Sequence, residues 1–84
     1  MARDATDLED DIRGRWDRSS PTLDERGRRL FAANEAVAIG FGGVAAVHRA
    51  TSVARSTIRR GIAELDDLER LAPPEGMQRN PGAG

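Results

Sequence analysis

The sequence predicts a small all-α domain. Apolar residues recur at spacings of three and four along most of the 84 residues, which is typical of amphipathic helices. Residues 6–9 (Thr-Asp-Leu-Glu) and 22–25 (Thr-Leu-Asp-Glu) match the capping box that begins a helix. No segment alternates apolar and polar residues as a half-buried strand would. We therefore expect helices over residues 6–17, 23–39, 44–51 and 54–70.

The predicted helices divide the chain into three segments. Residues 1–20 form an acidic N-terminal segment whose short helix carries one narrow apolar stripe, and this stripe must dock on the main body or fray. Residues 21–72 form the main domain, in which a short helix, a tight turn and a second helix make a helix-turn-helix motif. Pro73 and Pro74 end the last helix. Residues 73–84 have few apolar side chains, and we expect a disordered tail there.

The apolar faces of the three principal helices predict the core. The residues expected to be mutually buried are Leu30, Val37, Val47, Val53, Ile58 and Ile62. Gly40 is expected to end the second helix. The glycine-rich corner at residues 40–43 would let two helices meet at a sharp angle, with Phe41 packed beneath it. No strand precedes this corner and no Gly-Lys-Ser/Thr follows, so a phosphate-binding loop is not predicted.

The composition argues against an enzyme, a metal site and a bound cofactor. There is no cysteine and only one histidine, which excludes thiolate sites and leaves little material for a histidine site. Adjacent acids at 10–11 and 66–67 would point apart on a helix and could not share a metal ion. No apolar run approaches the roughly 20 residues that span a membrane. We expect a soluble cytoplasmic protein without a catalytic residue.

The charge pattern singles out the middle of the chain. All 13 basic residues are arginine, which coding bias from GC-rich DNA would also explain. Residues 26–63 hold seven arginines and one acid, whereas residues 1–25 have a net charge of −4 and residues 64–84 one of −3. A basic centre between acidic flanks fits a nucleic-acid module, although a solvated surface of mixed charge is the simpler alternative.

The last predicted helix carries the candidate DNA-binding residues. Its exposed face would present Arg55, Ser56, Arg59 and Arg60 without an acid, and small side chains would let it enter a major groove about 12 Å wide. Arg49, on the preceding helix, could reach the flanking phosphates. An ordinary amphipathic helix is also polar outside, but it usually mixes the two signs of charge. We therefore expect double-stranded DNA as the partner.

Three motifs together resemble the N-terminal region of ISAzo-type insertion-sequence transposases. They are Leu-Asp-Glu-Arg-Gly-Arg-Arg-Leu at 23–30, Gly-x-Gly-Gly-Val at 40–44 and Arg-Ser-Thr-Ile-Arg-Arg-Gly-Ile-x-Glu-Leu at 55–65. The resemblance covers residues 20–84, and residues 78–84 resemble the start of that family's basic connector. It implies a helix-turn-helix that recognises terminal inverted repeats. It also implies a downstream RNase H-like catalytic domain, which has no counterpart in these 84 residues.

The turn departs from that family's usual Thr-Gly-Leu-Ser. Ser52 replaces a glycine in a left-handed conformation and Ala54 replaces a serine cap, each at a cost of about 1 kcal/mol. His48 takes the place of an alanine at the close contact between the two helices. It would either contact DNA or be a tolerated bulky side chain that splays the motif.

Two alternatives to direct DNA binding stay open. Three weakened positions in one motif would suit a transposase remnant without function. A protein-interaction module is the second alternative: Leu65, Leu68 and Leu71 with an N-terminal stripe of Leu8, Ile12 and Trp16 would form a surface for a second copy or for an intact transposase, which the chain would partner or inhibit.

Overall fold

The computed structural model describes residues 5–71 and is all-α over that range. The elements are α1 (Ala5–Ser19), the 3-10 helix η1 (Ser20–Thr22), α2 (Glu25–Ile39), α3 (Gly43–Thr51) and α4 (Arg55–Leu71). No strand occurs among the described residues. Each of the four predicted helices is confirmed to within two residues at either end. The tail predicted over residues 73–84 lies outside the described range.

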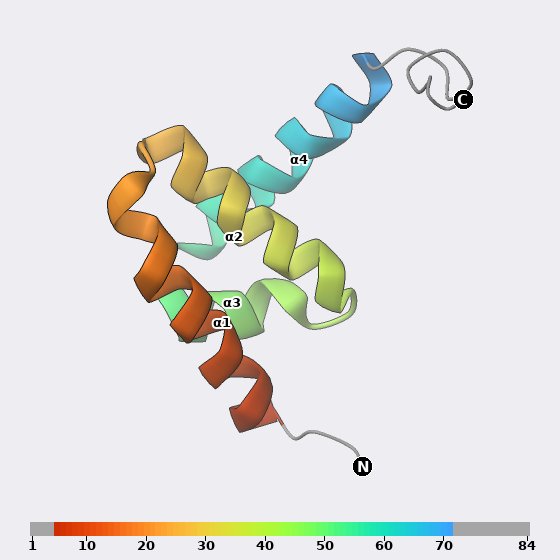
Figure 1. Cartoon of the computed structure of the whole chain (residues 1–84). Coiled ribbons are helices and arrows are strands. Elements are labelled where there is room, and N and C mark those ends of the chain that lie inside the picture. Colours follow the sequence, from red (N-terminus) through yellow and green to blue (C-terminus); the bar gives the residue numbers. More distant parts are fainter. Residues whose placement is uncertain (1–4, 72–84) are drawn as a thin grey trace, which may run out of the picture.

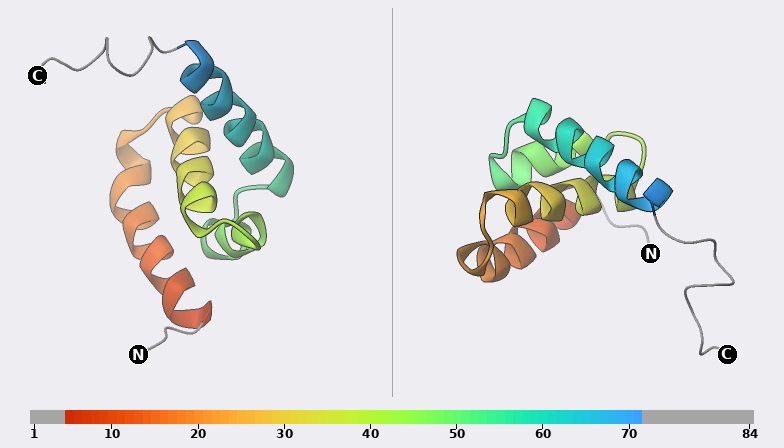
Figure 2. Two further views of the ribbon diagram at one scale, coloured as in Figure 1. Left: turned by 90° about the vertical axis from the view of Figure 1, so that its right-hand side faces the viewer. Right: turned by 90° about the horizontal axis from the view of Figure 1, so that it is seen from above.

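Helix α2 is at the centre of the arrangement. It packs against α4 and α3, while α1 packs mainly on α3. In the left view of Figure 2, α2 lies between α1 and α4, and α3 lies across the end of this layer. Figure 1 shows α2 and α4 crossing and then diverging towards the end of α4. Side chains also tie α1 to α2: the rings of Trp16 and Phe31 meet edge to face at 5.8 Å, and Arg15 donates two hydrogen bonds to Glu35.

The start of α2 differs from the predicted capping box. Asp24, not Thr22, is the N-cap, because its carboxylate accepts a hydrogen bond from the amide of Gly27 at 2.7 Å. The hydroxyl of Thr22 instead donates to the main-chain oxygen of Ser19, the last residue of α1. Both residues have cap-forming side chains, and the extra turn of 3-10 helix moves the start of α2 two residues along. Thr6, the other predicted cap, lies inside α1.

The core is built largely from alanine, which the prediction missed. Ile12, Val47 and Ile58 have no exposed surface, and five alanines join them in the interior: Ala32, Ala33, Ala36, Ala46 and Ala50. Small side chains let helices approach closely. The helices are therefore closest to one another at the alanines, and the larger apolar side chains fill the spaces around these contacts.

Of the six predicted core residues, two are fully buried and one is on the surface. Val47 and Ile58 are buried as expected, whereas Leu30, Val53 and Ile62 are only partly covered. Val37 was wrongly assigned to the core, since it is 55% exposed. It lines an open groove between α2 and α4 together with Ile62 and Leu65, so its side chain stays accessible to solvent.

Two glycines mark the closest helix contacts. A β-carbon added at Gly43 would collide with the main chain of Ala36, and one added at Gly61 would lie 2.7 Å from the main-chain oxygen of Arg29. Gly43 therefore sets how closely α3 approaches α2, and Gly61 sets the crossing of α2 and α4. Neither glycine could be replaced without moving a helix.

The corner between α2 and α3 confirms one prediction and corrects another. Helix α2 ends at Gly40, which has a φ of +83°, and Gly42 has a φ of +81°. Both values favour glycine. Phe41, expected beneath the corner, is instead fully exposed. Phe41 lies between these two glycines, and its side chain faces solvent.

Candidate nucleic-acid interface

A three-residue connection joins α3 to α4. Residues 52–54 separate the two helices, and Ser52 has φ +67° and ψ +6°, the left-handed conformation expected for it. Its amide donates to the main-chain oxygen of His48 at 2.9 Å and so closes the end of α3. The oxygen of Ala54 accepts from the amide of Ile58, which puts Ala54, with no capping side chain, at the start of α4.

Side chains of α3 hold this turn in place. The hydroxyl of Thr51 donates to the oxygen of Val47 at 2.8 Å and accepts from the amide of Val53 at 3.1 Å. Nδ1 of His48 lies 2.7 Å from the oxygen of Val53. A carbonyl can only accept, so Nδ1 carries the proton. His48 is thus bonded to the turn, and this contact stiffens the connection between α3 and α4.

The first two turns of α4 present a positive face. Arg55, Ser56 and Arg59 are all exposed, and neither arginine forms an ion pair with a residue in the 5–71 range. Ile58 is fully buried and fixes which side of the helix faces the core. Arg55 and Arg59 are four residues apart, so they lie one above the other on the same side.

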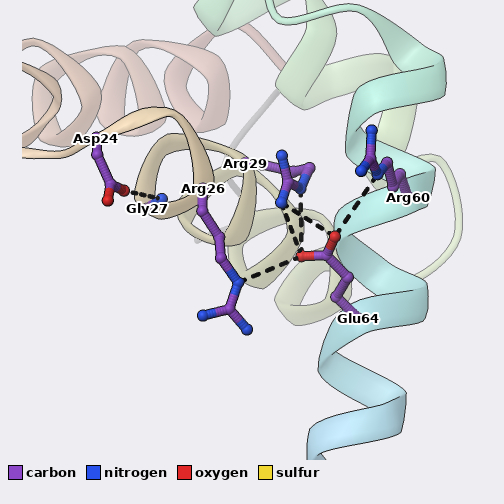
Figure 3. A network of polar contacts seen from close by, with 6 residues as sticks. All are labelled: Asp24, Arg26, Gly27, Arg29, Arg60 and Glu64. Carbon is purple, nitrogen blue, oxygen red and sulfur yellow. Dashed lines mark hydrogen bonds and ion pairs between the residues drawn. The ribbon is translucent and has the colours of Figure 1, made fainter.

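Arg60 shares its carboxylate partner with two arginines of α2 (Figure 3). Nε of Arg60 is 3.6 Å from the Glu64 carboxylate, and Arg26 approaches the same group at 3.8 Å. Arg29 binds it most closely, because its Nε and Nη2 atoms donate to Oε1 of Glu64 at 3.2 and 3.1 Å. The side chain of Arg29 is only 11% exposed. Glu64 therefore joins α4 to α2 and offsets part of the predicted positive charge.

Arg49 is engaged by the N-terminal helix. Its guanidinium donates to the carboxylate of Glu9 on α1, with distances of 2.7 and 2.9 Å. This hydrogen bond raises the pKa of Arg49 above its ordinary value, so the group stays charged. Half of the side chain is exposed. Arg49 is thus available to a phosphate only in competition with Glu9.

Sequence reasoning missed both acidic partners. The Arg60–Glu64 pair follows from its i, i+4 spacing on a helix, and that spacing was visible in the sequence. The contacts of Glu64 with Arg29, and of Glu9 with Arg49, join residues 35 and 40 positions apart. Nothing in the local pattern signals them.

The proposed apolar interaction surface is not continuous. Ile12 is fully buried, and Leu8 and Trp16 are partly buried, so the stripe on α1 docks on the body of the domain rather than facing a partner. Leu68 and Leu71 remain exposed towards the end of α4. The prediction of one apolar surface formed by α1 and α4 together is therefore wrong, although Leu68 and Leu71 of α4 are exposed as it required.

Within residues 5–71, no three acidic or histidine side chains are grouped so as to hold a metal ion. No helix in this range has the length and apolar character needed to cross a membrane.

Comparison of the chain with family models, curated proteins and solved structures gave no match in any of the three.

Proposed function

We propose that this chain is a DNA-binding module in which α3, the turn and α4 act as a helix-turn-helix, with α4 lying in the major groove. One observation carries the proposal: Arg55, Ser56 and Arg59 stand exposed on the first two turns of α4 without an acidic partner in residues 5–71. In such motifs the N-terminal residues of the second helix contact base edges.

The local chemistry of α4 suits a nucleic acid. An arginine can bind a phosphate or make two hydrogen bonds to one guanine. The start of α4 adds free amides and the positive end of the helix dipole. Ser56 and Ala63 are exposed and small, so they leave room for the helix to approach the bases.

The internal ion pairs predict weak, salt-sensitive binding. Arg49 and Arg60 must exchange Glu9 and Glu64 for phosphates, and the released carboxylates would stay near the negatively charged duplex. Such binding depends on counterion release and falls steeply as salt rises. The transposase resemblance suggests terminal inverted repeats as the target, and we propose that the chain acts in the cytoplasm. It also implies that catalysis would reside in a separate domain.

A salt titration tests this function. A labelled duplex of mixed sequence should bind at low salt, and the logarithm of the affinity should fall linearly with the logarithm of the salt concentration. Replacing one phosphate-contacting arginine should flatten that slope by about one unit. Absence of binding at low salt would favour a remnant or a protein-interaction module.

A further inference from the structure

A groove between α2 and α4 is not used by the DNA-binding face. Val37 of α2 forms one wall, and Ile62, Leu65 and Leu68 of α4 form the other. Its lining residues on α4 begin directly after Gly61, the point of closest contact with α2. Val37 is 55% exposed and Leu68 is 46% exposed, so apolar surface on both walls faces solvent.

We propose that this groove binds an amphipathic helix of a partner protein, one with an apolar stripe flanked by basic residues. Ile62, Leu65 and Leu68 follow one another at intervals of three along α4 and make a continuous apolar wall. A helix that lays its apolar face into such a groove uses side chains at i, i+3 or i+4, and i+7.

The rim of the groove is acidic. Asp66 and Glu69 both line it. Asp66 pairs with Arg70 of its own helix at 2.8 Å, whereas Glu69 has no ion pair with a residue in the described part of the chain. Glu64 is bound by three arginines outside the groove, and residues 65–71 contain three acids and one arginine, a net charge of −2. Basic residues beside the apolar stripe of a partner would complement this rim.

The same charges argue against a second copy of this chain in the groove. Two identical copies would meet through the same patch on each, which would set Asp66 and Glu69 of one copy against the same residues of the other. Like charges placed together across an interface are unfavourable. The patch therefore fits a basic partner better than itself.

The groove and the DNA-binding face occupy different parts of α4. Arg55 and Arg59 are on its first two turns, while the groove begins at Ile62. The module can therefore hold DNA and a partner helix together. The groove proposal does not depend on DNA binding, and the two can fail separately.

Three fluorescently labelled synthetic peptides test the groove. The first is a helical peptide with leucines at i, i+4 and i+7 flanked by arginines, the second has glutamates in place of the arginines, and the third has serines in place of the leucines. Fluorescence anisotropy should show saturable binding of the first peptide. The other two should bind about tenfold more weakly or worse, because each lacks half of the complementarity.

Leu68→Glu separates apolar docking from simple charge attraction. It makes the rim more acidic, so a purely electrostatic contact would tighten, whereas the proposal predicts a loss of about tenfold or more for the arginine peptide. Val37→Glu, on the opposite wall, should act in the same way. Thr6→Glu, at an exposed position on α1 outside both the groove and the DNA-binding face, is the control with the same charge change, and it should not weaken peptide binding. Circular dichroism checks that each variant is folded.

Three results would overturn the proposal. The first is no saturable binding of the arginine peptide by the folded wild-type chain. The second is binding that Leu68→Glu and Val37→Glu leave unchanged or strengthen. The third is a dimer in sedimentation equilibrium that Leu68→Glu abolishes, since a second copy would then occupy the groove.

Discussion

Gly61 of α4 meets Ala33 of α2 so closely that a β-carbon added at Gly61 would lie 2.9 Å from the Ala33 Cβ atom. The same added carbon would lie 2.7 Å from the main-chain oxygen of Arg29. Backbone atoms cannot move aside as the end of a side chain can. The crossing of α2 and α4 therefore requires glycine at position 61.

Gly61→Ala should lower the free energy of unfolding by about 1–3 kcal/mol in urea denaturation, because the added methyl group forces the helices apart. Gly14→Ala is the matched control in α1. There the added carbon would meet only the guanidinium of Arg18, at 3.5 Å, so the better helix propensity of alanine should stabilise the domain by about 0.5–1 kcal/mol. Equal stabilisation by both changes would contradict the close crossing.

Ile58 and Val37 should respond very differently to truncation. Ile58 is fully buried, so Ile58→Ala should cost about 2–5 kcal/mol through lost apolar burial and the cavity left behind. Val37 is 55% exposed, and Val37→Ala should stay within about 0.5 kcal/mol of the wild type. Similar losses for the two variants in urea melts would show that Val37 is in the core after all.

Substitutions at two positions of the turn between α3 and α4 should raise the stability of the domain. Ser52→Gly removes the left-handed strain of a residue with φ +67° and should stabilise the domain by about 1 kcal/mol. Ser52→Ala keeps a β-carbon and should give no such gain. Ala54→Ser should add an N-cap to α4, again with a gain of about 1 kcal/mol. A thermal melt in which Ser52→Gly and Ser52→Ala behave alike would mean that the strain is absent.

The elements of this fold could be predicted from the sequence, but the core could not. Helical spacing, glycines and prolines placed all four helices, because these signals act over a few neighbouring residues. Side-chain burial depends on which faces meet. Alanine carries little apolar signal, so Ala33 and Ala36 were missed. Phe41 lies between two glycines with positive φ, and its exposure depends on the path of the turn, which the apolar pattern does not give.

The candidate site was predictable only in part. The arginines on the exposed face of α4 follow from periodicity, because Ile58 fixes the buried side. Their partners do not follow, because Glu9 and Glu64 reach arginines on other helices. The net charge of a segment counts all seven central arginines equally. In the structure, Arg49 and Arg60 pair with carboxylates, whereas Arg55 and Arg59 form no ion pair with a residue in the range 5–71.

The Arg49–Glu9 pair gives a test of which arginines reach the duplex. If Arg49 contacts a flanking phosphate, Glu9→Gln should raise the affinity for DNA, since Arg49 no longer has to leave a carboxylate at 2.7 Å. Asp10→Asn is the control, because Asp10 is exposed on the same helix and the net charge changes equally. Duplex titrations at low salt should show the larger gain for Glu9→Gln. Equal gains would show that Arg49 acts only through the overall charge.

The most direct test compares two double variants in a titration of labelled terminal-repeat duplex and scrambled duplex at low salt. Arg55→Ala with Arg59→Ala removes the two arginines of α4 that form no ion pair with a residue in the range 5–71. Arg13→Ala with Arg18→Ala removes the same charge from exposed positions on α1. The proposed function predicts that the α4 variant loses binding to both duplexes and that the α1 variant largely keeps it. Any preference of the wild type for the repeat should disappear with the α4 pair, because a base-reading arginine contributes about 1–3 kcal/mol of discrimination. Equal binding by the two variants, or no binding by the wild type, would contradict DNA recognition through α4.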